Sequence, residues 1–156
     1  MTHQFITQYL EFVAEHSSQA KFLLAHGIPF TTNENTYKGK RGKQHECFAN
    51  SAHEALNKNR IYVEGYITCY GVPLEHAWTT DNKGNVFDPT LKPPCDRIGG
   101  YFGIPFKTEY LAQCLMTNKV YGLLGYASIK TLKPLLNGEV QDFKVELTKG
   151  EPQCAY

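Results

Sequence analysis

The pattern of apolar and polar side chains between residues 60 and 70 predicts a β-strand. Alternate positions would face opposite sides of a sheet, with Ile61, Val63, Ile67 and Cys69 on one side and Tyr62, Glu64, Tyr66, Thr68 and Tyr70 on the other. Gly65, in the middle of this strand, predicts either a bulge or the close approach of another backbone. The glycine and proline at positions 71 and 73 then turn the chain into a second strand over residues 74–80.

A hairpin is predicted to connect this second strand to a third. The turn falls at residues 82–84 and the return strand at residues 85–88, where Pro89 limits its length. A three-residue loop with Gly in third place is a type I turn followed by a left-handed bulge. Such a loop pairs Asp81 with Asn85, Trp78 with Asp88, and His76 with Thr90.

The register of this hairpin decides which side chains meet. It places His76, Trp78 and Asp88 on one face, with Asp88 as a diagonal neighbour of His76 within reach of a hydrogen bond. A two-residue loop would put His76 and Asp88 on opposite faces. The pairing of acid and imidazole therefore depends on the length of the turn.

Helical spacing of apolar residues predicts the other elements. Residues 46–56 form a helix with Cys47 in its first turn, and residues 4–26 form a helix, broken near Ser17 and ending at Gly27, that covers a sheet. Residues 28–44 read as a solvated loop. Towards the C-terminus the pattern predicts a short aromatic strand or edge segment over 101–106, a helix over 108–116 capped by Thr108, a strand over 120–126, a helix over 128–136, a strand over 140–147 and a frayed tail over 150–156.

These elements indicate an α+β fold in one domain of 156 residues. Its core spans about residues 44–91, where a helix packs on an antiparallel sheet, with a helical cover at 4–26 and α/β additions at 101–147. The formal net charge of +1 argues against a nucleic-acid or other polyanionic partner. No secretory signal and no run of ~20 apolar residues is visible, so the expectation is a cytoplasmic protein without a membrane partner.

Five cysteines, without C-x-x-C spacing, predict reduced thiols and argue against a zinc site. No metal and no cofactor is expected. Cys47 stands out because the dipole and the unsatisfied N–H groups of a helix N-terminus favour a thiolate and can hold an oxyanion. Cys95, in the Pro/Gly-rich loop of residues 92–100, has no such setting. An imidazole oriented by a carboxylate is the usual partner of a nucleophile, which makes Cys47, His76 and Asp88 a candidate set.

The segments H-A-W at His76 and G-x-V-x-D-P-T ending at Thr90, which follow a cysteine on a helix, resemble the transglutaminase-like branch of the papain-fold cysteine enzymes. The resemblance covers roughly residues 44–91. It implies a papain-like core with Cys47 as nucleophile, His76 as base and Asp88 as the acid that orients it. It also implies that a side-chain amide helps to hold the oxyanion, for which Gln44 is the candidate, against the alternative of a simple surface residue.

The function expected from this resemblance is a thiol-dependent hydrolase or acyltransferase acting on an amide or peptide-type bond, with a peptide, protein or small amide as substrate. Peptidase, amidase or deamidase activity is favoured over cross-linking, since no calcium-site signature is visible. The alternatives are an inactive papain-fold binding module or partner inhibitor, and an α+β domain in which the three residues never meet. Trp78 would either pack in the core or shield the Cys–His pair from water and line the substrate groove. The basic residues at 38–43 form either a solvated loop or a rim that attracts an acidic substrate.

Overall fold

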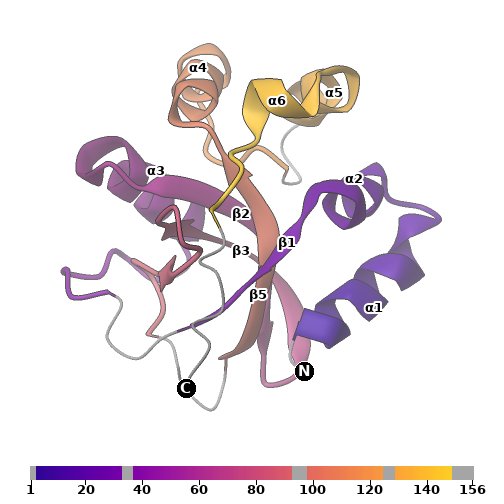
Figure 1. Ribbon diagram of the computed structural model, residues 1–156, viewed down its shortest axis with the longest axis horizontal. Coiled ribbons are helices and arrows are strands. Elements are labelled where there is room, and N and C mark those ends of the chain that lie inside the picture. Colours follow the sequence, from indigo (N-terminus) through magenta and orange to yellow (C-terminus); the bar gives the residue numbers. More distant parts are fainter. Residues whose placement is uncertain (1–2, 33–36, 93–97, 125–128, 149–156) are drawn as a thin grey trace, which may run out of the picture.

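The computed structural model describes residues 3–32, 37–92, 98–124 and 129–148. They form an α+β fold with one sheet and several helices (Figure 1). The helices are α1 (His3–Ala14), α2 (Ser18–His26), α3 (Cys47–Lys58), α4 (Thr108–Asn118), α5 (Ile129–Asn137) and α6 (Val140–Phe143). The strands are β1 (Ile28–Phe30), β2 (Ile61–Cys69), β3 (Val72–Thr80), β4 (Val86–Phe87) and β5 (Ile98–Phe106).

The five strands form a single antiparallel sheet in the order β1-β5-β2-β3-β4. The sheet is curled. Phe30 on β1 packs against Trp78 on β3 with ring centroids 5.4 Å apart, although two strands lie between β1 and β3. Neighbouring strands in a flat sheet are separated by about 4.8 Å, so the contact requires a concave face. A bridge between Thr31 and Asn85 also brings the two ends of the sheet together.

The predicted hairpin register is confirmed. Thr79 pairs with Phe87 and Thr80 with Val86, which is the register of a three-residue loop. Gly84 has a φ of +85° and closes the turn through its N–H, which donates to the carbonyl of Asp81. The Asp81 carboxylate fixes the same turn by accepting the backbone N–H groups of Lys83 and Asn85. The sequence of the turn therefore sets the register.

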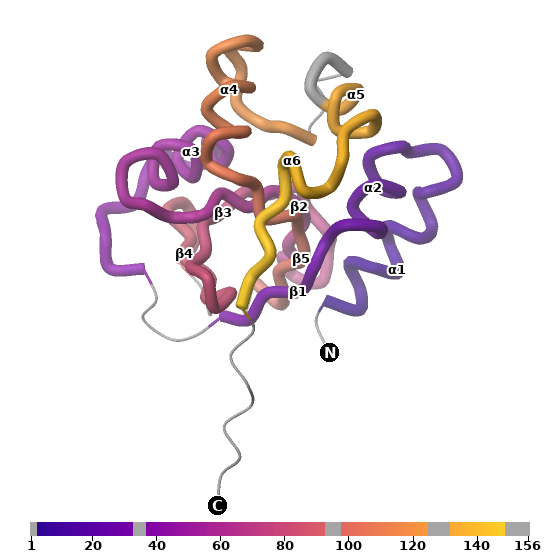
Figure 2. Tube along the Cα trace, turned by 45° about the horizontal axis from the view of Figure 1, so that its top comes forward, coloured from indigo at the N-terminus to yellow at the C-terminus, as the bar shows by residue number. Residues whose placement is uncertain are grey.

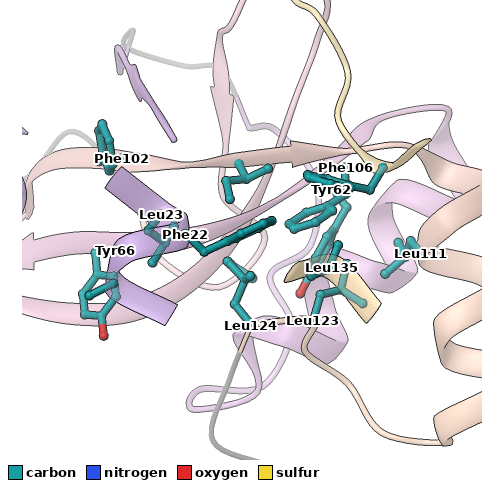
Figure 3. Close-up of a cluster of buried hydrophobic side chains, with 14 of the residues drawn as sticks. Phe22, Leu23, Tyr62, Tyr66, Phe102, Phe106, Leu111, Leu123, Leu124 and Leu135 are labelled. Atoms are coloured by element: carbon teal, nitrogen blue, oxygen red, sulfur yellow. The ribbon is translucent and has the colours of Figure 1, made fainter. Parts of the chain in front are cut away.

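The alternation predicted for β2 is also confirmed, but both faces of the strand are buried. Val63 and Ile67 join Phe30, Trp78, Val86 and Tyr101 in a small cluster on the concave face. The other face carries Tyr62 and Tyr66, which belong to a larger cluster with members from each of the described helices. Figure 3 shows part of this cluster. In that larger cluster, Phe22 and Leu23 of α2 meet aromatic rings of β2 and β5, and Leu111 of α4 closes one end. A strand buried on both faces is held firmly, so the side chains that it and its neighbours present are well positioned.

Gly65 is a point of close backbone approach, which was one of the two predictions made for it; the other was a bulge. It lies opposite Gly103 of β5, and a side chain at this position would collide with the Phe102 carbonyl. The irregularity in the β2–β5 pairing lies elsewhere, between Ile67 and Cys69. Cys69 itself is half-buried rather than buried.

The N-terminal helices follow the prediction. The break falls between Ala14 and Ser18, and the Ser17 side chain caps α2 by accepting the N–H of Ala20. The loop predicted for residues 28–44 is wrong at its start, because residues 28–30 form the edge strand β1 paired with β5. A three-residue strand with a central proline carries no periodic signal, and an edge strand tolerates Pro29. Conversely, β5 lies between β1 and β2 and is not an edge segment.

Three predictions about the C-terminal third are wrong in the described residues. Thr108 is the first residue of α4 and Lys107 takes the cap position, without a side-chain cap. Residues 120–124 form no strand, because the backbone N–H groups of Leu123 and Leu124 donate to the buried Glu64 carboxylate instead of to a neighbouring strand. Residues 140–143 of the strand predicted over 140–147 form the short helix α6, and Phe143 packs in the core. After this helix, Lys144 makes a single β-bridge with Phe106. The predicted tail over 150–156 lies outside the described residues.

Helices α4, α5 and α6 gather at one end of the sheet, while α1 and α2 flank it and α3 lies beside β3 (Figures 1 and 2). Within the described ranges, no helix combines the length and the apolar character needed to cross a bilayer.

Candidate active site

Cys47 is the first residue of α3, as predicted, and its side chain is 9 % exposed. Four residues after it in the helix are also buried, namely Ser51, Ala52, Glu54 and Ala55. Two residues before it, His45 has a φ of +65°, a left-handed conformation that is uncommon for a residue with a side chain. His45 belongs to the turn of residues 44–45 that leads into the helix.

His76 and Asp88 are joined by a hydrogen bond of 2.7 Å between Nε2 and Oδ2. His76 lies on β3 and is 4 % exposed, and Asp88 follows β4 and is fully buried. Strand β4 pairs with β3 only at Thr79 and Thr80, so β3 has no β4 partner beside His76. The confirmed register therefore produces the acid–imidazole pair that the sequence predicted.

The Asp88 carboxylate accepts hydrogen bonds on both oxygens. Oδ1 accepts the backbone N–H groups of Thr90 and Leu91 at 2.8 and 2.7 Å, which makes the D-P-T-L segment an Asx-type turn. Oδ2 accepts the Tyr101 hydroxyl at 2.9 Å in addition to His76. Burial acts to raise the pKa of Asp88, but the positive imidazole and the hydrogen bonds from His76, Leu91 and Thr90 outweigh burial and lower it. Asp88 is therefore an oriented, ionised carboxylate.

Cys47 lies close enough to His76 to act on its imidazole, whose pKa the Cys47 side chain helps to raise. Because Nε2 of His76 is engaged by Asp88, the Nδ1 atom is the one left to face the thiol. Burial acts to lower the pKa of His76, but Asp88, through its charge and its hydrogen bond, and Cys47 together raise this pKa to about 9. The imidazole therefore holds a proton at neutral pH, with the Asp88 carboxylate bonded to it and the Cys47 side chain near it.

This pKa makes stability depend on pH. A group whose pKa is about 9 in the folded protein and 6.5 in the unfolded chain binds its proton more tightly in the folded state. Its stabilising contribution is complete below pH 6.5 and is lost as the pH rises through about 9. We expect the free energy of unfolding of the wild type to fall across this window relative to that of His76→Gln. Urea unfolding at a series of pH values measures this difference, and a difference that stays constant with pH would contradict the charged imidazole.

A set of hydrogen bonds joins the segment before Cys47 to the segment after Asp88. The N–H of Gly42 donates to the carbonyl of Pro89 at 2.8 Å, and the amide of Asn50 donates both to the Lys43 carbonyl and to the Thr90 hydroxyl. Arg41 Nε donates to the Leu91 carbonyl. Asn50, one turn along α3 from Cys47, thus ties the helix of the thiol to the loop of the carboxylate.

Trp78 is a fully buried core residue that walls the imidazole. Its ring lies 6.3 Å from that of His76 and 4.9 Å from that of Tyr101. With no exposed surface it shields His76 instead of lining an open groove. Gln44 lies in the turn before α3 with an exposed side chain, three residues from Cys47.

Only some of the basic residues at 38–43 are available to attract an acidic substrate. Lys43 pairs with Glu46 at 2.8 Å, and the Arg41 guanidinium lies over the Tyr37 ring. Lys38 and Lys40 are exposed. Cys95 lies outside the described residues. Those residues hold no group of three or more His, Cys, Asp or Glu side chains placed to bind a metal ion.

Two residues at the sheet were not identified from the sequence. Tyr101 contacts Asp88 from β5, which is far from it in the chain, and a tyrosine in an aromatic strand gives no sign of such a contact. Glu64 is buried on the helix-covered face, where its carboxylate accepts the Tyr62 hydroxyl and two backbone N–H groups. Burial raises the pKa of Glu64 against the opposing effect of these donors.

Comparison with known proteins gives no assignment: no family model, no curated protein and no solved structure matches the chain.

Proposed function

We propose that this chain is a thiol-dependent hydrolase or acyltransferase that acts on an amide or peptide-type bond, with Cys47 as nucleophile, His76 as acid and base, and Asp88 as the orienting acid. In this proposal the start of α3 and the strands β3 and β4 form a papain-like core of the transglutaminase-like type. The observation that carries the proposal is the burial of Cys47, His76 and Asp88 from three separate elements, with His76 bonded to Asp88 and its pKa raised by both neighbours.

In the proposed reaction, the proton of the Cys47 thiol already lies on Nδ1 of His76 before the substrate binds, so the site begins as a thiolate and an imidazolium. The thiolate attacks the carbonyl carbon of the substrate, and the tetrahedral intermediate collapses as the C–N bond breaks. The imidazolium returns its proton to the leaving amine. The resulting thioester is cleaved by water, whose proton passes to His76 as the Cys47 thiolate leaves, and this restores the starting ion pair. Asp88 stays ionised throughout and keeps the imidazole in position.

The oxyanion would lie at the N-terminus of α3. The backbone N–H of Cys47 belongs to the first turn of the helix, where N–H groups have no partner within the helix. Gln44, exposed three residues earlier, would supply the second donor through its side-chain amide. Water is favoured over an amine as acceptor because the sulfur site, 9 % exposed, admits a water molecule more easily than a second substrate.

One observation favours a second function. The three side chains of the site are almost fully enclosed, which also suits an inactive binding module in which they only stabilise the fold. The two functions differ in the state of the thiol, because an enzyme of this class holds a thiolate at neutral pH and a structural thiol stays protonated.

The test is the rate of iodoacetamide alkylation of each cysteine against pH, read by peptide mass spectrometry. We expect Cys47 to react faster at pH 6 than Cys69 and Cys114, and its rate to change little between pH 5 and 8. The ultraviolet absorbance of the thiolate, compared between wild type and Cys47→Ala, gives the same information without requiring the reagent to enter the site. A Cys47 that ionises like an ordinary thiol, near pH ~8.5, would remove the enzymatic proposal and leave the binding module.

A further inference from the structure

Tyr101 and His76 share one oxygen atom of Asp88. The Tyr101 hydroxyl donates to Oδ2 at 2.9 Å, and the same atom accepts from His76 Nε2 at 2.7 Å. The other oxygen, Oδ1, is occupied by the backbone N–H groups of Thr90 and Leu91. The two side-chain donors therefore compete for the negative charge of a single atom.

Tyr101 is held rigidly in this position. It lies in the interior of the sheet, where it pairs with Phe30 of β1 and Ile67 of β2, and its side chain is fully buried. Its ring packs edge-on against Trp78 at 4.9 Å and lies 6.3 Å from the ring of His76. A hydroxyl fixed in this way cannot turn away to solvent, so its hydrogen bond to Asp88 is a permanent part of the site.

We propose that Tyr101 is a positioning residue that withdraws negative charge from Oδ2 of Asp88 and so limits how strongly the carboxylate holds the proton on His76. A hydrogen bond to an ionised carboxylate lowers its basicity, and a less basic partner stabilises an imidazolium less. Tyr101 would thus act on the thiol chemistry through two intermediates, Asp88 and His76, without touching the substrate.

The proposal gives Tyr101 a role in the acid step. Without the Tyr101 hydroxyl, Asp88 would hold the proton on His76 more tightly, which would slow its transfer to a leaving amine. The groups that face His76 are Cys47 from α3, Asp88 from the segment after β4 and Tyr101 from β5, and the nearby Arg41 cation contacts the Leu91 carbonyl of the same segment. The consequence for catalysis rests on the proposed function, but the effect on His76 does not.

The experiment is an NMR titration of the His76 ring in the full chain, with no substrate present. In Tyr101→Phe, which removes only the hydroxyl, we expect the proton-binding constant of His76 to rise about three- to tenfold. Tyr66→Phe is the matched control, since Tyr66 donates to the Glu75 carboxylate on the other face of the sheet at 3.1 Å. That variant should leave the titration of His76 unchanged.

A second variant acts in the opposite direction and preserves the packing. 3-Fluorotyrosine at position 101 is a stronger donor than tyrosine, so it should lower the proton-binding constant of His76. An unchanged titration in both variants, or a shift of the same sign in both, would overturn the proposal and leave Tyr101 as a packing residue. The result stands apart from the alkylation test, because His76 titrates whether or not Cys47 is a nucleophile.

Discussion

Alkylation of Cys47 by iodoacetamide at pH 5 is expected to slow about 30-fold in His76→Ala. Without the imidazolium, the thiol is expected to behave as an ordinary one, of which only about one part in 3,000 is ionised at this pH. The thiolate that does form in His76→Ala is intrinsically more nucleophilic than the thiolate of the wild type. This difference offsets the loss of alkylation rate by as much as about a hundredfold. The two effects leave a net decrease of about 30-fold.

The shape of the pH profile is a sharper criterion than the rate at one pH. The wild-type rate should be nearly flat between pH 5 and 8, whereas the rate in His76→Ala should rise about tenfold per pH unit, as for a free thiol. Asp88→Asn should fall between the two, because the imidazole remains but loses the carboxylate that keeps it charged.

His53→Ala is the control for this experiment. His53 lies on α3 together with Cys47, but it is exposed and bonds to the Tyr121 hydroxyl. Its removal should leave the profile of the wild type intact. Equal profiles in the wild type and His76→Ala would show that His76 does not activate the thiol, and the proposed function would fall.

Gly65→Ala is expected to lower the free energy of unfolding by about 3 kcal/mol, since it forces a side chain into a closed backbone contact. A Cβ at this position would lie 2.5 Å from the Cα of Gly103 and closer still to the Phe102 carbonyl, whereas real Cβ contacts stay above 3.0 Å. The neighbouring atoms are backbone, so neither strand can yield without breaking the pairing of β2 with β5. His76 lies opposite Gly65 on the other side of β2, so β3, which carries His76, would shift as well.

Thermal and urea unfolding measure this effect, with Gly71→Ala as the control. Gly71 has a φ of +75° in the β2–β3 turn, and a Cβ there meets nothing within 4 Å. Its replacement should cost only the left-handed backbone strain, about 1 kcal/mol. Similar losses in the two variants would mean that the contact between β2 and β5 adapts, and that the close approach is not required.

The local sequence was sufficient for the hairpin that makes the site. The Asp81 carboxylate, the glycine at position 84 and the alternation along β3 act over a few residues, so they fix the register and bring His76 to Asp88 without reference to the remaining chain. The same holds for α3 and for the placement of Cys47 at its start, because the apolar spacing of the helix and the loop before it are local features.

What only the tertiary structure decided lies in contacts between segments that are distant in the chain. Strand β1 exists because β5 offers it an edge, and the residues after α4 bend around Glu64 instead of forming the predicted strand. Tyr101 reaches Asp88, and Trp78 becomes fully enclosed, because the sheet curls. Curvature and long-range pairing depend on the whole set of packed side chains, so no short pattern encodes them. The sequence thus determined which groups form the candidate site. The fold determined how deeply these groups are buried and that Tyr101 bonds to Asp88.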